Sequence, residues 1–559
     1  MKKIPLILTI LIILFGFWIR FYRLDLNSPS IYTDEASRFF DLANLFKPTQ
    51  SFLDFLYKNL FLRLTTFTWF LDLTPLGVRL PSVGFGTLFL ILIYWLAKEI
   101  NFEKKKDWQL IPLVTLILAT FLPWEVHLSR IGYTSVILSL IMVGIHWLIY
   151  LKAKTVKAYF LSLFFLLLAA YFYPSMVLIG PLALVLVLFK IWQLNFSTKY
   201  KKMILIISLI LIAIFAYMFF KRGFYYRGFD LAIWRDINVT AAENIDRGLA
   251  RLSNPTIFSL NLNPELVGRF FYNRPIAIIN NFFRIYLSFY SPDFLFLKGD
   301  SILRHSTGRF GVLYPFLLPF LVYGVFLFFT KGEKKTKEMF LFWLLVSPIP
   351  AALTKDGDGY LLRATYMLPL LTYLSSLGLV EFLKIFENKL KIVLTIFLFL
   401  IFSFSIYSFL FNYFHVYPAK SARSFEYGFK ELADWQRRED EQSLLVIWEG
   451  YYPRSYFGFW QPSFYKNLSD FIVKKITIEQ SNFYQGGENL YFSLPRTEND
   501  LQIFLKENKI SFLALPGDLK ESFSSYQLFK QKPINIINYP DQTPAFYLYQ
   551  IFSTSVIKD

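Results

Sequence analysis

The stretch KIVLTIFLFLIFSFSIYSFLF, residues 391–411, decides the fold class. Its only charge is Lys391 at the first position, and a run of this kind crosses a membrane as one helix when it is about 20 residues long. The sequence after it changes to mixed polar and apolar residues. The stretch therefore predicts a boundary between a transmembrane domain over residues 1–411 and a soluble domain over residues 412–559.

Similar apolar runs recur through the first of these two domains. The 559-residue chain is 55% hydrophobic and 20% aromatic, and its charges are confined to the gaps between the runs, as is typical of an α-helical polytopic membrane protein. The first run lacks a small-x-small cleavage site, so we expect a retained anchor and not a signal peptide. The sequence predicts about eleven transmembrane helices, near residues 4–22, 80–97, 108–124, 133–151, 158–173, 175–190, 203–220, 311–330, 337–353, 364–383 and 391–411.

Lysines occupy alternate gaps and predict the orientation. Because positive charges favour the cytoplasmic side, these gaps and the N-terminus are expected in the cytoplasm. The loops over residues 23–79 and 221–310 and the C-terminal domain then lie outside. The stretch Pro275–Leu297 is apolar but contains Asn280, Asn281, Arg284 and Asp293, which predicts an interfacial helix. If it spans instead, the C-terminal domain is cytoplasmic. The lysines are Lys2, Lys3, Lys98, Lys104–Lys106, Lys152, Lys154, Lys157, Lys190, Lys199, Lys201, Lys202, Lys331, Lys334, Lys335, Lys337, Lys384, Lys389 and Lys391.

The C-terminal segment, residues 412–559, reads as a small extracytoplasmic α/β domain. Helical spacing appears in GFKELADWQRRED (428–440) and DLQIFLKEN (500–508). Short apolar runs predict strands, and we expect the domain to bind or position an acceptor. The predicted strands are SLLVIW (443–448), ENLYFSL (488–494), KISFLAL (509–515), INIINY (534–539) and AFYLYQIF (545–552).

Composition narrows the function classes. The net charge of +18 comes largely from loops between spans, which fits lipid headgroups or phosphate-bearing substrates and does not indicate nucleic acid. No Walker A loop, dinucleotide-binding glycine pattern or zinc spacing occurs, so no cofactor is assigned. Asp356 and Asp358, in LTKDGDGYLLRATYMLP (353–369), either bind a divalent metal or simply form a turn.

An acidic pair stands in SIYTDEASRFFDLANL, residues 30–45, just after the first span. Thr33 is expected to cap a helix with Asp34 and Glu35 in its first turn, where the helix dipole favours carboxylates. Ala36, Phe39, Phe40 and Ala43 would form a packing face, and Phe39 and Phe40 would hold the helix on the bundle. One interpretation is a helix cap with a headgroup contact; the other is a general base that takes a proton from an acceptor hydroxyl.

Cationic residues gather in other outer segments. Arginine near a membrane surface either extends its charge to the interface or binds phosphate oxygens through its planar guanidinium. The segments are PWEVHLSRIGYTS (123–135), SPDFLFLKGDSILRHSTGRFG (291–311) and the stretch 353–369. The candidate phosphate-binding residues in them are Arg130, His127, Arg304, His305 and Arg363.

The order of these motifs resembles a known superfamily. The retained first helix, the pair Asp34–Glu35, RLPSVGFGTLFLILIYWLAKEI (79–100) and HLSRIGY (127–133) together resemble bacterial GT-C glycosyltransferases. These are related to family 39, the protein O-mannosyltransferases, and to the lipid A aminoarabinose transferase. SPDFLFLKGDSILRH (291–305) resembles a stretch of bacterial members. The sequence departs from them at Gly359 and Tyr360, where relatives often carry Pro-His.

The resemblance implies a cell-envelope enzyme of the bacterial plasma membrane. It would transfer a hexose or pentose, with inversion, from a polyprenyl-phosphate-linked donor to a glycan, lipid or protein acceptor outside the cytoplasm. Asp34 would be the catalytic base with Glu35 as its acidic neighbour, and Arg130 would hold the donor phosphate.

Two alternatives remain open from the sequence. An oligosaccharide polymerase, ligase or oligosaccharyltransferase would use a lipid-diphosphate donor with similar residues. A transporter or flippase would carry charged or Pro/Gly-broken helices near the bilayer midplane. Here the polar residues gather near one side of the predicted spans, which favours an enzyme.

Overall fold

The computed structural model describes residues 4–38, 40, 63–65, 73–100, 110–193, 198–221, 230–252, 256–257, 260–261, 263–439, 442–450, 452–461 and 473–551. The chain forms two compact units. We call them the bundle unit, Met1–Arg20, Val83–Ser129 and Tyr133–Phe409, and the sheet unit, Phe21–Ser82, Arg130–Gly132 and Leu410–Asp559.

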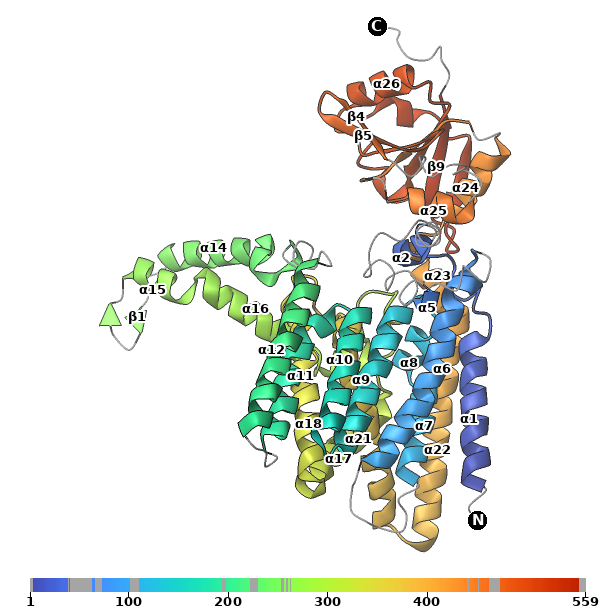
Figure 1. Cartoon of the computed structure of the whole chain (residues 1–559). Coiled ribbons are helices and arrows are strands. Elements are labelled where there is room, and N and C mark those ends of the chain that lie inside the picture. Colours follow the sequence, from blue (N-terminus) through green and yellow to red (C-terminus); the bar gives the residue numbers. More distant parts are fainter. Residues whose placement is uncertain are drawn as a thin grey trace. The chain divides into compact units, whose positions relative to one another are not determined.

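Helices of the bundle unit coincide with the predicted spans. A helix occurs at each of the eleven predicted positions, which confirms the α-helical polytopic fold class (Figure 1). Short helices α8 (Pro123–Leu128), α19 (Ile349–Ala352) and α20 (Leu361–Ala364) connect some of them. The long helices are α1 (Ile4–Phe21), α6 (Pro75–Glu99), α7 (Leu110–Phe121), α9 (Thr134–Lys152), α10 (Val156–Phe172), α11 (Ser175–Trp192), α12 (Thr198–Lys221), α17 (Leu318–Lys331), α18 (Lys334–Val346), α21 (Leu368–Ile385) and α22 (Asn388–Phe411).

Length and apolarity support a membrane location for these helices. Among the described residues, five helical stretches are long and apolar enough to cross a membrane. Five shorter apolar helices accompany them: Leu6–Phe21, Leu110–Phe121, Val156–Phe172, Leu205–Phe220 and Pro315–Lys331. The orientation inferred from the lysines remains a prediction.

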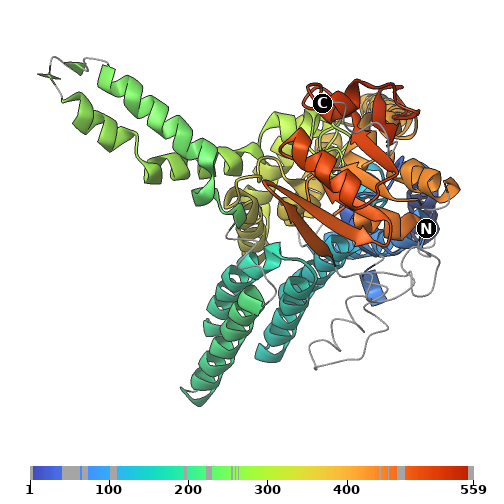
Figure 2. The same ribbon diagram turned by 90° about the horizontal axis from the view of Figure 1, so that it is seen from above.

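An arm of three helices projects from the bundle (Figures 1 and 2). It consists of α14 (Ile237–Leu252), α15 (Pro264–Phe271) and α16 (Arg274–Ser288), with the hairpin of β1 (Thr256–Ile257) and β2 (Leu260–Asn261) at its tip. Backbone hydrogen bonds tie its base to the bundle unit, since Ile233 N–H donates to Leu353 O at 3.0 Å and Lys355 N–H to Leu231 O at 2.8 Å.

The sheet unit contains a seven-stranded mixed sheet in the order β4-β5-β6-β3-β7-β9-β8. Central strand β3 (Leu444–Ile447) runs parallel to β6 (Leu490–Ser493) and β7 (Phe512–Pro516). The outer pairings are antiparallel and involve β4 (Lys474–Ile478), β5 (Ser481–Gly487), β8 (Asn535–Asn538) and β9 (Pro544–Gln550). The predicted strands are confirmed, whereas β4 and β5 were not predicted.

Helices cover both faces of this sheet. Leu444 and Val446 of β3 pack with residues of α24 (Phe429–Arg438) and α25 (Arg454–Trp460). Leu445 and Ile447 pack with residues of α26 (Glu498–Glu507) on the other face. Because successive side chains of a strand point to opposite faces, two separate cores result.

The acidic segment contributes to the first of these cores. Ile31 and Ala36 are fully buried in it, together with Val78, and Phe40 packs against it. The predicted packing face is therefore confirmed for Ala36. Phe40, which was predicted to hold this helix on the bundle, packs against a core whose apolar side chains come mostly from α24, α25 and the sheet. Phe39 and Ala43 lie outside the described residues.

Candidate active site

The acidic pair lies on a single helical turn, α2 (Thr33–Ala36). Tyr32 is the N-cap residue, with no side-chain cap. The predicted capping role of Thr33 is therefore wrong, because its Oγ1 forms a hydrogen bond with Tyr456 Oη at 2.8 Å. Consecutive residues of a helix point about 100° apart, and here the turn leaves Asp34 exposed while Glu35 is buried.

Glu35 is locked by a buried arginine. Arg79 Nε donates to Oε1 at 2.8 Å and Nη2 donates to Oε2 at 2.9 Å, a bidentate pair between fully buried side chains. Gly132 N–H adds a third hydrogen bond to Oε1 at 3.0 Å. A Cβ at Gly132 would lie 2.8 Å from Glu35 Cγ, so the contact requires glycine. Both carboxylate oxygens of Glu35 are therefore engaged.

Arg79 also anchors the chain that leads to the acidic pair. Its Nη1 donates to Leu24 O at 3.2 Å and its Nη2 to Ser30 O at 2.6 Å. One guanidinium thereby fixes the segment after the first span at several points. Arg79 was not among the predicted site residues, although a charge at the start of an apolar run is the signal that would have indicated a buried partner.

Asp34 has different surroundings from its neighbour. Within the described residues, its carboxylate makes no hydrogen bond or ion pair, and Ser37 Oγ donates only to its backbone carbonyl, at 2.8 Å. An exposed, ionisable carboxylate next to a buried, fully engaged one has the accessibility that a general base requires.

Arg130 lies buried in the sheet unit. Its Nη2 donates to Tyr22 O at 2.7 Å, and its guanidinium carbon lies 5.4 Å from the ring centre of Tyr413 and 5.0 Å from that of Phe414. Burial lowers the pKa of this guanidinium, and the contact with Tyr413 partly opposes that effect. The contacts place Arg130 against carbonyl and aromatic groups, and its role toward phosphate remains a prediction.

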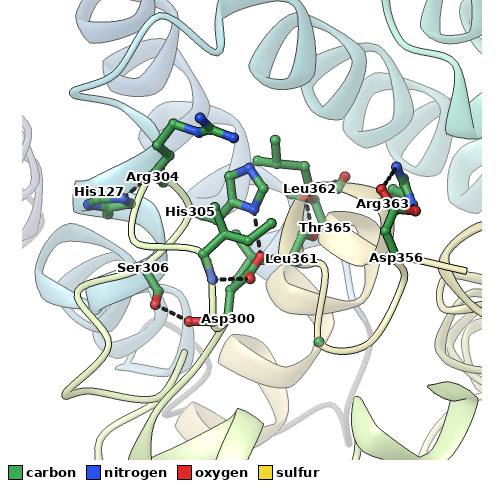
Figure 3. Close-up of polar contacts among 12 residues, drawn as sticks. His127, Asp300, Arg304, His305, Ser306, Asp356, Leu361, Leu362, Arg363 and Thr365 are labelled. Atoms are coloured by element: carbon green, nitrogen blue, oxygen red, sulfur yellow. Dashed lines mark hydrogen bonds and ion pairs between the residues drawn. The ribbon is translucent and has the colours of Figure 1, made fainter. Parts of the chain in front are cut away.

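A second polar cluster is formed within the bundle unit, around Asp300 (Figure 3). Asp300 Oδ1 accepts Ile302 N–H at 2.8 Å, which closes an Asx turn. Its Oδ2 accepts Leu361 N–H at 2.8 Å and His305 Nδ1–H at 2.7 Å. The side chains of Asp300 and His305 are both buried. The carboxylate thus connects the loop after Gly299 to the start of α20.

His305 and His127 hold this loop from two sides. The His305 ring lies 4.6 Å from the ring of Tyr360 and 5.6 Å from that of Tyr133. His127 Nε2 donates to the backbone carbonyl of Arg304 at 2.9 Å. Figure 3 shows the Arg304 side chain directed away from Asp300. The structure therefore brings His127, Arg304 and His305 together, with the histidines in positions that fix the backbone around Arg304.

Arg363 contacts a carboxylate of its own loop. Its Nη1 donates to Asp356 Oδ1 at 2.7 Å and its Nη2 to Oδ2 at 3.1 Å. Burial alone would raise the pKa of Asp356, but the Arg363 hydrogen bonds outweigh this and hold it below its ordinary value. Asp358 pairs separately with Arg284. In the part of the chain that the structure describes, no group of three His, Cys, Asp or Glu side chains is placed to hold a metal ion.

A further buried ion pair fixes the first helix. Arg20 pairs with Glu125 of α8, and its Nη1 donates to Gly16 O at 2.8 Å. Ser129 Oγ donates to Glu125 Oε1 at 3.3 Å. Like Arg79, Arg20 was not among the candidate residues, and both arginines stand at an end of an apolar run.

Comparisons with known proteins give distant structural likenesses. No protein-family profile matches the sequence, and no curated protein matches it. The chain is similar to the crystal structure of the Archaeoglobus fulgidus oligosaccharyltransferase in complex with Zn and sulfate, at 13% identity over 96% of this chain and 73% of that chain, with a TM-score of 0.44. At this identity and TM-score, the similarity assigns no activity to the chain.

Proposed function

We propose that this chain is a membrane glycosyltransferase that transfers a sugar, with inversion, from a polyprenyl-phosphate-linked donor to an extracytoplasmic acceptor. The observation that carries the proposal is the difference in exposure and hydrogen bonding between Asp34 and Glu35. Glu35 is bound on both oxygens by Arg79 and Gly132, whereas Asp34 is exposed at the first turn of α2. The apolar helices and the order of the motifs support it as well.

Asp34 acts as the base in this proposal. Its carboxylate takes the proton of the acceptor hydroxyl while that oxygen attacks the anomeric carbon of the sugar. The bond from this carbon to the phosphate oxygen breaks, and the polyprenyl phosphate leaves. A positioned base of this kind typically contributes roughly 10²–10⁴-fold to the rate. Glu35 and Arg79 hold the turn that presents Asp34.

Cationic side chains would stabilise the departing phosphate. Arg130 and Arg304 are the arginines proposed for this contact, and Arg363 with His127 and His305 completes the proposed set. His127 and His305 would act by fixing the loop around Arg304, since their ring nitrogens bind Arg304 O and Asp300. Loss of one well-placed electrostatic partner typically costs about 3–4 kcal/mol of transition-state stabilisation.

The test compares Asp34→Asn with Glu35→Gln in proteoliposomes that contain radiolabelled polyprenyl-phosphate sugars and membrane extract as the source of acceptor. Asp34→Asn keeps the size of the side chain and removes the base, so transfer should fall by roughly 10²-fold or more with an unchanged unfolding midpoint. Normal transfer by Asp34→Asn would exclude Asp34 as the base. If Glu35→Gln alone is inactive while remaining folded, the two roles are exchanged.

A parallel reaction with polyprenyl-diphosphate oligosaccharides addresses the alternative. Transfer from the diphosphate donor, with none from the monophosphate donor, would identify an oligosaccharide polymerase, ligase or oligosaccharyltransferase. Both reactions use the same Asp34→Asn control, so the base and the donor are tested separately.

A further inference from the structure

The helices of the arm expose large apolar side chains, among them Ile245 and Leu249 of α14 and rows on α16 and α15. On α16, Ile279, Phe283 and Leu287 are 52%, 53% and 59% exposed. On α15, Leu266 and Phe270 are 65% and 69% exposed. Spacing of four residues places the members of each row on one side of their helix. A soluble surface seldom exposes so many large apolar groups together, and such patches indicate an interaction site.

The charged residues beside these rows indicate a lipid surface as the partner. The two helices contain three arginines, Arg269, Arg274 and Arg284, and one carboxylate, Glu265. Apolar and aromatic side chains flanked by arginine are typical of helices that lie in the headgroup region of a bilayer. A basic helix also complements anionic phospholipids.

Contacts with the bundle set the level of α16 along the spanning helices. Tyr286 Oη donates to Leu345 O at 2.7 Å, and Tyr290 Oη donates to Leu344 O at 2.5 Å. These carbonyls belong to the last turn of α18, which ends at Val346. Figure 1 shows α15 and α16 below α14, on the side toward which the bundle helices run. The C-terminal part of α16 is therefore attached to the bundle at the end of α18.

Local hydrogen bonds keep α15 and α16 in a defined orientation. Asn273 stands between them, where its Oδ1 accepts Ile276 N–H at 3.1 Å and its Nδ2 donates to Phe270 O at 2.7 Å. Arg284 pairs with Asp358 at the base of the arm. Because both ends of α16 are held, its exposed row has a fixed direction.

We propose that α15 and α16 lie on the outer surface of the bilayer, with Phe270 and the row Ile279, Phe283 and Leu287 inserted between lipid headgroups. The arm is then a second membrane-binding element beside the spanning bundle. This inference is independent of the proposed glycosyltransferase activity, because it rests on the exposed rows and on the contacts of α16 with α18.

Because the chain contains no cysteine, single labels are easily placed. Phe283→Cys and Phe270→Cys, in the full-length protein, would each carry an NBD fluorophore in vesicles of phosphatidylcholine and phosphatidylglycerol. Asp246→Cys on α14, also exposed, is the matched control. A spin label on the lipid acyl chain should quench the Phe283 and Phe270 labels about twofold or more relative to the Asp246 label, while aqueous iodide should show the opposite order.

Equal quenching of all three labels by the lipid probe would overturn the proposal. A Phe283 label shielded from iodide but not reached by the lipid quencher would indicate a protein partner and would also overturn it. All three positions are exposed, so the unfolding midpoint of each labelled protein should match that of wild type, and this measurement confirms that the labels report on the native arm.

Discussion

Glu35 and Asp300 are both buried carboxylates, yet they are held by partners of different chemistry. Glu35 binds Arg79 through both oxygens and receives Gly132 N–H. Asp300 binds His305 and receives Leu361 N–H and Ile302 N–H. Arginine remains charged at every physiological pH, whereas histidine can change its protonation state. The first cluster is therefore a permanent lock, and the second joins a carboxylate to an imidazole and two backbone N–H groups.

In both clusters, the residues that hold the backbone differ from the residue that is the candidate for chemistry. In the first cluster the support and the candidate base are adjacent residues, Glu35 and Asp34, and only Asp34 is exposed. In the second, the buried pair fixes the loop that presents Arg304. In both clusters the buried carboxylate holds the backbone in place, and the candidate for contact with substrate is a nearby residue, exposed at Asp34 and half-buried at Arg304.

The largest effect is expected from breaking the permanent lock. Arg79→Met leaves the Glu35 carboxylate buried without its cation, and such a change typically costs roughly 3–5 kcal/mol of stability. Thermal unfolding of the detergent-solubilised protein measures the loss. Arg437→Met is the matched control because its ion pair with Asp434 is exposed, and a surface pair is worth about 1 kcal/mol or less. If the unfolding midpoint of Arg79→Met falls no further than that of the control, the Glu35–Arg79 pair does not stabilise the fold as proposed.

An intermediate effect is expected at Asp300. Asp300→Asn retains one carbonyl oxygen but leaves a hydrogen-bond donor of the cluster unsatisfied, at a cost of about 1–3 kcal/mol. Transfer activity should fall further than stability alone explains, because the loop around Arg304 loses its anchor. His305→Gln still offers Asp300 an amide N–H, so this variant should retain more transfer activity than Asp300→Asn. Identical activity in both variants and wild type would remove this cluster from the site.

The smallest effect is expected from Arg130→Lys. An ammonium keeps the charge but not the planar pair of donors, so binding of a polyprenyl-phosphate sugar should weaken by about tenfold, with a larger loss in Arg130→Ala. The unfolding midpoint of the lysine variant should change little, since one hydrogen bond to Tyr22 O can be kept. Wild-type donor affinity in both variants would confine Arg130 to a structural role beneath Tyr413 and Phe414.

The sequence predicted the elements far better than the contacts between them. Apolar runs and short strand patterns located the spans and most strands, because these signals are local. Strands β4 and β5 were missed because KKITI and SNFYQGG carry few apolar residues. The pairing of Glu35 with Arg79 joins residues 44 positions apart, and no local pattern specifies such a contact.

In the candidate site, too, the sequence indicated the residues but not their contacts. Asp34, Glu35, His127, Arg304 and His305 were selected by residue type and place. Their different roles depend on burial, which one sequence does not reveal for adjacent residues such as Asp34 and Glu35. The packing of Ala36 in the sheet unit was likewise unpredictable, since an amphipathic pattern says that a face is covered but not by what.

The shared core of the acidic segment and the C-terminal sheet sets an order for biosynthesis. Ala36 leaves the ribosome early, but its partners Phe546 and Leu548 are made some 510 residues later, on the order of half a minute to two minutes at ordinary synthesis rates. The turn that carries Asp34 therefore cannot reach its final packing until strand β9 has been made. A chain released before β9 would insert its spans but would leave Ala36 without these partners, so the proposed base would stand on an unsupported turn.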